Sequence, residues 1–527
     1  MTDSPSLIKT DVVVIGAGTS GLATLKCLRD TGLKAIVLEN FGEVGGLWMF
    51  RENEYGVMRF TNINVSKYNY CFSDFPFPDD TLDYPHNKDV ANYIVEYVKN
   101  FNLHEDIRFH RKVLDIEKIG EDWQTTAKHV DDDGKTVLEN EPAEIYRSKF
   151  IAIATGHHAR PSMPNFPGQD SFKGDIIHSV KYNDAISNDV TGKRVLIVGI
   201  GNSAVDVAVD CATVGRCKPV YISTRSGAWV GPNYVFGHPA DIYACRLFFK
   251  LPFTLANFIV EKIICLVSGH PRRWNLNPKM KALQRQPTIS STLIHHIQRK
   301  DIKIVQNIKR IDGSRVFFMD GESAEFDNII MCTGYKIDLP FLSADTQKLV
   351  LNKDTNEMKL YKNVFSPDIG QSMAFIGFVQ PASGGVLTMS ETQARWFAEL
   401  CQGRVKLPSK SEMERDMQEE RRSCEGRYGR SSGHTMQKDP IVYNDEIADL
   451  IGAKPSIWKH PDLAWRLMFG SCGAYQWRLQ GPHKWKGAKE AVKKVPLTEL
   501  MHYFGILLVV FVAVILYYCY SLFTYLF

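Results

Sequence analysis

The sequence lacks three features, and each absence excludes a class of protein. Its eleven cysteines include no CxxC pair, the closest two being Cys211 and Cys217, which argues against a zinc site, a disulfide framework and a redox dithiol reductase. Lysine and arginine (63) nearly balance aspartate and glutamate (59), and no basic stripe is interleaved with aromatics, so we expect no nucleic-acid partner. The first ten residues hold no apolar core of signal-peptide length. We therefore expect a reduced, cytosolic body without a metal ion.

Charge is also missing from residues 503–527, which contain no Asp, Glu, Lys or Arg. About 20 apolar residues suffice for a helix to cross a bilayer, and an interfacial helix would need a polar stripe that this segment lacks. The segment is preceded by five lysines: Lys484, Lys486, Lys489, Lys493 and Lys494. The positive-inside rule then keeps the body in the cytosol. We predict a membrane anchor over 503–527, with a buried core helix as the alternative.

A second apolar stretch, 246–267, is interrupted by charged residues and a proline. These interruptions make a membrane span unfavourable. We expect this stretch to lie against a membrane surface or to cover a core.

Near the start of the chain, a short β-branched strand over 11–15 leads into Gly16, Gly18 and Gly21 at GxGxxG spacing. A helix is expected over 20–31, and the next strand, AIVLE, ends in Glu39. This order is typical of a dinucleotide site, in which the pyrophosphate lies on the helix N-terminus and the carboxylate accepts hydrogen bonds from the ribose.

A second unit of the same kind carries Gly199, Gly201 and Ala204, and its next strand, VYIST, leads into Arg225. An arginine at the ribose position fits the 2′-phosphate of NADP, whereas Glu39 would repel that group. The two turns therefore predict FAD at the first site and NADPH at the second. An exposed arginine at a strand end is the alternative for Arg225.

Between the two turns, FKGDIIHSVKY (172–182) matches the pattern FxGxxxHxxxY at Phe172, Gly174, His178 and Tyr182. Further motifs follow in order: GEVGGLW (42–48), SKYNYCFSDFPFP (66–78), IATGHH (153–158), CTGY (332–335) and DEIADLIGAKP (445–455). On these residues the chain resembles the flavin-containing monooxygenases, class B flavoprotein enzymes of the microsomal dimethylaniline N-oxide-forming type, over nearly its whole length. It departs from the pattern at Cys332, where alanine is usual, and in having one arginine after Thr224.

The resemblance implies an α/β fold with two nested Rossmann-like dinucleotide-binding domains and a C-terminal transmembrane helix. The expected divisions are an FAD domain begun by 1–155, an NADP domain over 156–331 with an apolar insertion around 230–285, a return to the FAD domain over 332–500, and the anchor over 503–527.

The resemblance also implies site residues. Those expected to bind FAD are Gly16, Ala17, Gly18, Thr19, Ser20, Gly21, Glu39, Leu47 and Trp48. Those expected to bind NADP are Gly199, Gly201, Asn202, Ser203, Ala204, Val205, Asp206 and Arg225. Asn64 and Val65 are also expected to contact the cofactors. Asn64 aligns with an asparagine near the flavin and nicotinamide and is the candidate catalytic residue, a turn asparagine being the alternative. His178 is either a general base or a structural residue in domain closure.

The implied reaction uses NADPH, FAD and O₂ to form a C4a-hydroperoxyflavin that oxygenates a soft nitrogen or sulfur centre of a small lipophilic amine or sulfide. Tyr182 favours this reading, because the related Baeyer–Villiger group has tryptophan there. Baeyer–Villiger oxygenation of ketones, uncoupled NADPH oxidase activity and a non-enzymatic nucleotide sensor remain alternatives. The expected location is the endoplasmic reticulum membrane, with the body tail-anchored on the cytosolic side and homo-oligomerisation left open.

Overall fold

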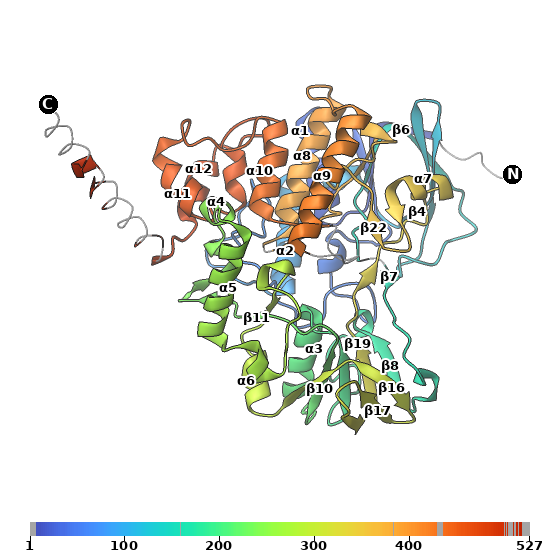
Figure 1. The fold of residues 1–527 in the computed structure, drawn as a ribbon. Coiled ribbons are helices and arrows are strands. Elements are labelled where there is room, and N and C mark those ends of the chain that lie inside the picture. Colours follow the sequence, from blue (N-terminus) through green and yellow to red (C-terminus); the bar gives the residue numbers. More distant parts are fainter. Residues whose placement is uncertain are drawn as a thin grey trace.

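The computed structural model describes residues 7–158, 160–382, 384–428 and 436–499, together with single positions between 501 and 518. Two large sheets, one mixed and one parallel, organise the molecule into two lobes (Figure 1). We call the lobe containing the N-terminal strand the first lobe and the other the second lobe.

The first lobe is built on a seven-stranded sheet in the order β3-β2-β1-β6-β5-β4, with β23 paired to the end of β6. Its strands are β1 (Leu7–Ile15), β2 (Ala35–Leu38), β3 (Ile107–Arg108), β4 (Arg111–Ile119), β5 (Asp122–His129), β6 (Glu144–Ile153) and β23 (Met373–Phe375). β1 pairs in parallel with β2 and β6, whereas β4 and β5 run antiparallel. The β-branched end of β1 is buried from Val12 to Ile15, as befits a central parallel strand covered on both faces.

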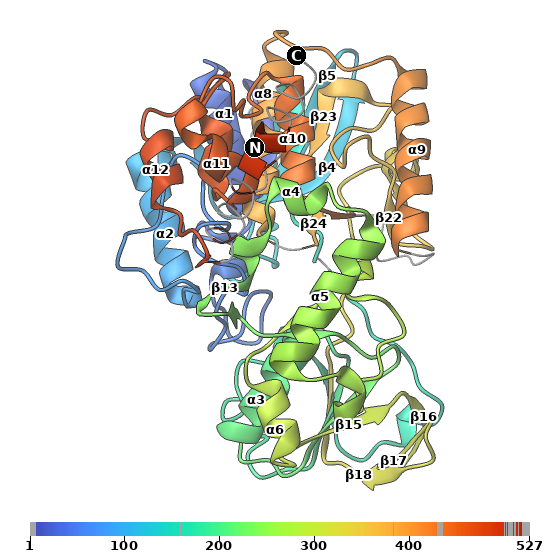
Figure 2. The same cartoon turned by 60° about the vertical axis from the view of Figure 1, so that its left-hand side comes forward.

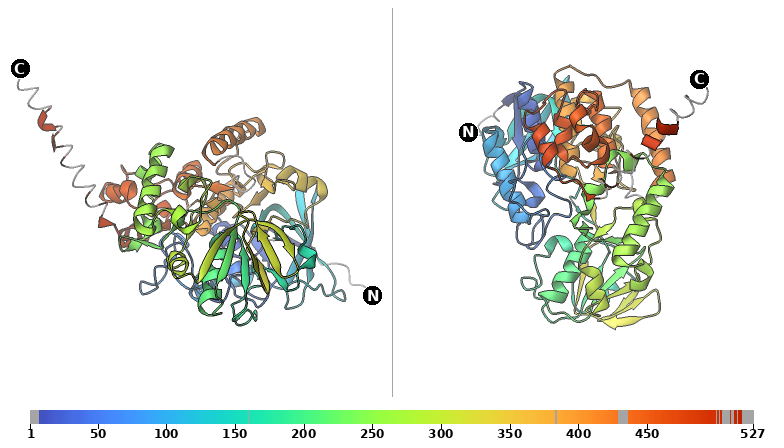
Figure 3. Two further views of the ribbon diagram at one scale, coloured as in Figure 1. Left: turned by 60° about the horizontal axis from the view of Figure 1, so that its bottom comes forward. Right: turned by 90° about the vertical axis from the view of Figure 1, so that its left-hand side faces the viewer.

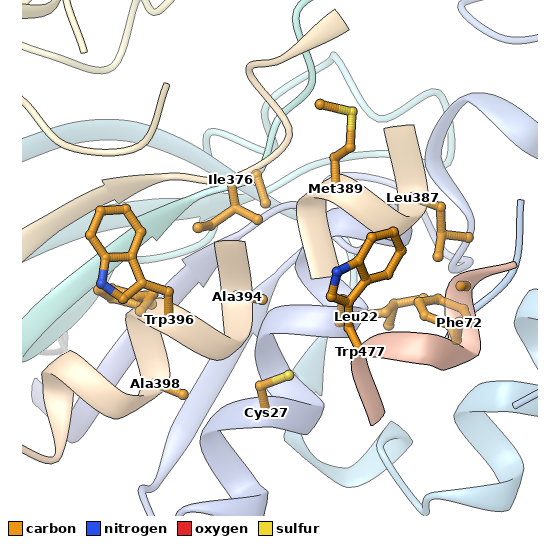
Figure 4. Packing of buried hydrophobic residues seen from close by; sticks show 14 of the residues in the cluster. Leu22, Cys27, Phe72, Ile376, Leu387, Met389, Ala394, Trp396, Ala398 and Trp477 are labelled. Atoms are coloured by element: carbon orange, nitrogen blue, oxygen red, sulfur yellow. The ribbon is translucent and has the colours of Figure 1, made fainter. Parts of the chain in front are cut away.

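Helix α8 (Val386–Cys401) is the centre of the first lobe, because fourteen of its sixteen residues are buried. It packs against α1 (Thr19–Asp30), and Figure 4 shows its side chains among those of α1 and of the segments after β23 and near Trp477. Two of its buried polar side chains illustrate how burial is compensated by hydrogen bonds: Glu391 accepts from Arg478 at 2.6 Å, and Gln393 accepts from the backbone N–H of Gly377 at 2.8 Å.

Other helices cover the first lobe. They are α2 (Asn87–Asn100), α7 (Ala344–Val350), α9 (Lys410–Tyr428), α10 (Pro440–Leu450), α11 (Ala464–Phe469) and α12 (Ala488–Lys494). Figure 3 shows α9 along the outer side of this lobe.

The second lobe contains a five-stranded parallel sheet in the order β15-β10-β9-β19-β8. Its strands are β8 (Asp175–His178), β9 (Val195–Val198), β10 (Val220–Thr224), β15 (Ile302–Gln306) and β19 (Asn328–Met331). Helices α3 (Asn202–Thr213) and α6 (Leu293–Gln298) pack beside it, and an antiparallel sheet is formed by β16 (Ile308–Asp312), β17 (Arg315–Phe318) and β18 (Ser323–Glu325).

A two-stranded ribbon joins the lobes where the chain enters and leaves the second one, and in it β7 (Arg160–Pro161) pairs antiparallel with β20 (Tyr335–Lys336). The backbone N–H of Ser162 donates to the carbonyl of Gly334 at 2.9 Å. The second lobe is therefore inserted into the chain of the first at one point.

An insertion within the second lobe reaches back to the first. It contains α4 (Arg246–Phe249) and α5 (Phe253–Ser268), and α5 runs between the lobes (Figure 2). Arg246 makes a two-pronged ion pair with Asp445 of α10, at 2.7 and 2.6 Å. Other short strands are β11 (Val230–Gly231), β12 (Tyr234–Val235), β13 (His238–Pro239), β14 (Thr288–Ile289), β21 (Leu351–Asn352), β22 (Glu357–Met358), β24 (Gln380–Pro381) and β25 (Gln437–Lys438).

The expected anchor over 503–527 falls largely outside the residues that the structure describes. Within the described part of the chain, no helix is both long and apolar enough to span a membrane.

Candidate active site

The first glycine turn joins β1 to α1, and its three glycines have different tasks. A Cβ on Gly21 would lie 1.8 Å from the carbonyl oxygen of Gly16, so this glycine permits the close contact of helix and strand. Gly16 has a φ of +99° and lies against Ala154 at the end of β6. A Cβ on Gly18, in contrast, would meet only the Cα of Gly46, at 3.7 Å. Gly18 therefore leaves open space beside the turn, at the N-terminus of α1.

Glu39 stands at this turn, as its place after β2 predicts. Its carboxylate accepts a hydrogen bond from the backbone N–H of Ala17 at 2.7 Å and another from Phe41 at 2.9 Å. Burial raises the pKa of Glu39, against the effect of these two hydrogen bonds. The acidic residue and the glycine turn thus form one site.

Other segments converge on the same edge of the sheet, where parallel strands end. Leu47 and Trp48 form a short 3-10 turn directly after Gly46. Thr155 follows β6, and its buried hydroxyl has no hydrogen-bond partner among the described residues. Gly377 follows β23, and its missing Cβ leaves room for the hydroxyl of Ser20, which would otherwise lie 2.3 Å away. Sequence reasoning missed Gly377, although the apolar run MAFIGF around it resembles the other strand-to-glycine exits.

The second glycine turn joins β9 to α3. Gly199 has a φ of +127°, and a Cβ there would lie 2.3 Å from the carbonyl oxygen of Cys332. Gly201 has an ordinary φ, and a Cβ there would meet no atom within 4 Å. The protein itself gives no steric reason for glycine at this position, so the open space beside Gly201 fits a ligand.

The neighbours of Gly201 divide into two groups. Ala204 and Val205 are fully buried in the core of the second lobe, so their side chains face away from the turn. Ser203 is exposed, and Asn202 accepts a hydrogen bond from the backbone N–H of Ile289 at 2.9 Å. Asn202 therefore holds a distant segment of the chain against this turn.

Two charged residues of the second unit, Asp206 and Arg225, have surroundings that the sequence alone does not reveal. Burial raises the pKa of Asp206 to about 7, well above that of an exposed carboxyl group. Arg225 is exposed at the end of β10, and Arg285 lies near enough for the charge of Arg225 to help lower its pKa, after the larger effect of desolvation. Sequence reasoning missed Arg285, because it is sixty positions away in the chain.

The FxGxxxHxxxY residues make contacts within the second lobe and with the segment that leaves it. Nδ1 of His178 accepts from the backbone N–H of Val180 at 3.1 Å, so Nε2 carries the proton that it shares with the carbonyl of Gly334, also at 3.1 Å. Burial lowers the pKa of His178. Both nitrogens of this neutral ring are occupied, which does not suit a general base.

The other residues of this motif fix the second lobe. Tyr182 donates a hydrogen bond of 2.7 Å to the carboxylate of Asp210 on α3. A Cβ on Gly174 would lie 1.9 Å from the carbonyl oxygen of Asp327, so only glycine fits, and Phe172 packs against the neighbouring core.

Asn64 lies in a segment that touches both lobes and the insertion. On one side of it, Arg59 forms an ion pair of 2.8 Å with Asp184, directly after the motif. On the other side, Ser66 donates to the carboxylate of Asp241 at 2.7 Å. Val65 is buried, whereas the Asn64 side chain is half-buried and has no hydrogen-bond partner among the described residues. Its amide is therefore available to a ligand.

A small cavity of about 30 Å³ opens beside this segment, between α8, α10 and the insertion. It is lined by Asn69, Asp241, Thr388 and Asn444, among others. Both amide atoms of Asn444 are buried without a partner among the described residues. The cavity offers polar groups to a water molecule.

Comparison with known proteins identifies the family. The family described as flavin-binding monooxygenase-like matches residues 9–500. The chain belongs to this family. It is therefore an oxidoreductase of the flavoprotein monooxygenase type, and the predicted resemblance, with its FAD and NADPH cofactors, is confirmed.

Two curated relatives show the extent of the similarity. The chain is 37% identical over 506 residues to flavin-containing monooxygenase 5 of Homo sapiens, covering 92% of each protein. It is 34% identical over 504 residues to dimethylaniline monooxygenase [N-oxide-forming] 2 of Oryctolagus cuniculus, covering 91% of this chain and 90% of that protein.

Solved structures share the fold. S-allyl-L-cysteine S-oxygenase from Allium sativum superposes with a TM-score of 0.63 at 22% identity, covering 86% of this chain and 91% of that one. The closed structure of cyclohexanone monooxygenase gives 0.62 at 16% identity, covering 85% and 98%. At these identities the likeness supports the two-lobed α/β architecture.

Proposed function

We propose that this enzyme uses NADPH and O₂ to oxygenate a soft nitrogen or sulfur centre in a small lipophilic molecule. The observation that carries the proposal is the pairing of two glycine turns with opposite charge at their ribose positions, Glu39 in the first lobe and Arg225 in the second. A carboxylate accepts hydrogen bonds from an unmodified ribose, and an arginine binds the 2′-phosphate.

The residues at each turn fit the cofactor assigned to it. In the first lobe, Gly18 leaves space at the N-terminus of α1, Glu39 stands at the ribose position, and the unpartnered hydroxyl of Thr155 supplies a further donor. In the second lobe, Gly201 leaves space at the N-terminus of α3. Backbone N–H groups and the helix dipole favour a pyrophosphate at both places.

Bound FAD, once reduced by NADPH, supplies the activation of O₂ and the transfer of one oxygen atom. The protein orients the cofactors and excludes water. Asn64, with its free amide between the lobes and the insertion, is the residue we assign to hydrogen bonding at the junction of nicotinamide and flavin. Leu47, Trp48 and Val65 supply an apolar wall around that junction.

We also propose that the enzyme is attached to the endoplasmic reticulum membrane by 503–527, with its body in the cytosol. The uncharged sequence of that segment and the lysines before it support this assignment. Helix α5 supplies a second apolar surface, since Leu255, Phe258 and Leu266 are 45%, 56% and 75% exposed.

The reaction is tested by product analysis with one thioether and one ketone, each incubated with the holoenzyme, NADPH and O₂. A sulfoxide as the main product supports the proposal. A lactone or ester would instead indicate Baeyer–Villiger oxygenation, and hydrogen peroxide without oxygenated product would indicate an NADPH oxidase.

A further inference from the structure

The ribose end of the second site holds two positive side chains from distant parts of the sequence. Arg225 follows β10 directly, and Arg285 donates a hydrogen bond of 3.0 Å from Nη1 to the hydroxyl of Ser226, the next residue. Both arginines are exposed. The guanidinium group of Arg285 therefore lies beside the residue that follows Arg225, near enough for the two charges to interact.

The segment that carries Arg285 is fixed against the second glycine turn. Thr288 donates from its hydroxyl to the carbonyl of Ile200 at 2.7 Å, and the backbone N–H of Ile289 donates to the side chain of Asn202 at 2.9 Å. Residues 200 and 202 flank Gly201. Arg285 thus lies beside the turn that we assign to the NADPH pyrophosphate.

The other side of this region is equally close-packed. A Cβ on Gly227 would lie 1.9 Å from the carbonyl oxygen of Leu276, and the backbone N–H of Lys279 donates to the carbonyl of Ser226 at 2.9 Å. The position of Ser226, and with it the anchor for Arg285, is therefore set by the backbone.

No carboxylate in the described part of the chain neutralises the two arginines. Among the described residues, no Asp or Glu oxygen lies within 4.0 Å of a guanidinium nitrogen of Arg225 or Arg285. Desolvation, and next the charge of Arg225, lower the pKa of Arg285. Two like charges held together without a counter-ion repel each other, and an anion bound between them relieves this cost.

We propose that Arg285 acts with Arg225 as the determinant of NADPH over NADH, by binding the 2′-phosphate of the adenosine half. Arg285 replaces the second arginine that the family pattern places after Thr224, where this chain has Ser226. The inference rests on the proposed function, in which this turn binds NADPH.

The test compares Arg285→Gln with the unmodified holoenzyme by titration calorimetry with 2′,5′-ADP and with 5′-AMP, which differ only in the 2′-phosphate. A charge-assisted hydrogen bond contributes enough for us to expect about a 10- to 100-fold loss of affinity for 2′,5′-ADP. The affinity for 5′-AMP should change less than about 2-fold. KM for NADPH should rise much more than KM for NADH.

Three further variants make the result specific. Ser226→Arg combined with Arg285→Gln should restore the affinity for 2′,5′-ADP, because it returns the charge to the position of the family pattern. Arg225→Ala should show the same selective loss as Arg285→Gln. Arg310→Gln, an exposed arginine on β16 of the same lobe, should leave both affinities unchanged.

The inference is overturned if Arg285→Gln weakens the binding of both ligands equally, or of neither. If only Arg225→Ala then shows a selective loss for 2′,5′-ADP, the proposed function still stands without a role for Arg285. An unmodified enzyme that does not distinguish 2′,5′-ADP from 5′-AMP would overturn the assignment of NADPH itself, and the inference with it.

Discussion

Asn53 and Asn183 are joined across the two lobes by a pair of hydrogen bonds. The backbone N–H of Asn53 donates to Oδ1 of Asn183 at 2.9 Å, and the amide of Asn183 donates back to Oδ1 of Asn53 at 3.3 Å. Asn183 follows Tyr182 of the FxGxxxHxxxY motif. The motif is therefore connected, through side-chain amides, to the segment of the first lobe that leads to Asn64.

This connection gives a prediction for Asn64. Replacing it with leucine removes the free amide without disturbing a hydrogen bond of the described structure, so the enzyme should still fold and still consume NADPH. Less of the NADPH should yield oxygenated product, and more should yield hydrogen peroxide, because the nicotinamide is held less firmly over the flavin and water enters. The ratio of peroxide to product, measured at fixed NADPH consumption, checks this.

Asn62→Ala is the matched control for Asn64→Leu. Asn62 is exposed, and among the described residues its amide donates only to the carbonyl of Tyr84, at 3.1 Å. Its replacement should leave the ratio of peroxide to product as it is in the unmodified enzyme. If both variants raise the ratio equally, or if Asn64→Leu does not raise it, the role assigned to Asn64 is wrong.

Gly201→Ala should separate binding from stability. A Cβ at Gly201 meets no protein atom within 4 Å, so the unfolding free energy should change by less than about 1 kcal/mol. The methyl group would enter the space assigned to the cofactor, so KM for NADPH should rise about 10-fold or more. Gly174→Ala is the opposite case: its Cβ would clash with Asp327, and we expect a loss of about 3 kcal/mol or more. Thermal unfolding and NADPH kinetics of both variants measure the contrast, which would be refuted if Gly201→Ala left KM unchanged.

Asp206 predicts a specific pH dependence of stability in the absence of NADP. Its folded-state pKa of about 7 lies above the unfolded value near 4, so between these values the folded chain holds a proton that the unfolded chain has released. The contribution of Asp206 to stability therefore falls as pH rises from about 4 to about 7. Asparagine at this position cannot ionise. The unfolding free energy of Asp206→Asn, taken relative to that of the unmodified enzyme, should therefore rise by about 1–3 kcal/mol as the pH increases through this window. Unfolding at pH 5 and pH 8 tests this, and a constant difference would contradict it.

The membrane proposal predicts that deleting 503–527 releases the protein from microsomes only in part, because the exposed face of α5 still adsorbs. Adding Phe258→Ser and Leu266→Ser to the deletion should complete the release. The control adds Ile186→Ser to the deletion, at a residue of the second lobe that is 67% exposed. This control should not complete the release. Flotation of the variants with microsomes measures the retained fraction, and full release by the deletion alone would exclude α5 from membrane binding.

The sequence predicted the two glycine turns because each is local: strand, turn and helix lie within about twenty residues, and the acidic or basic residue follows on the next strand. Glu39 and Arg225 accordingly lie where their spacing placed them. The motif at 172–182 was recognised as a pattern, but the contacts of His178 could not be predicted from it, since the partner Gly334 is far along the chain.

What the sequence could not predict depends on contacts between distant segments. Arg285 carries no local signal, because it belongs to neither strand nor helix of the second unit and reaches the turn only through the packing of the insertion. Thr155 and Gly377 belong to the first site for a similar reason, since β6 and β23 are brought together by sheet pairing. Ala204 and Val205, assigned to the nucleotide by position in a motif, prove to face the core.

The ribbon of β7 and β20 also sets the order in which the molecule is completed during synthesis. All five strands of the second sheet lie between residues 175 and 331, whereas the first sheet still lacks β23 and its central helix α8 when residue 331 leaves the ribosome. Domains fold as units when their chain is available. The second lobe can therefore fold on the ribosome while the core of the first lobe is still incomplete. The lobe that begins the protein is the last to close.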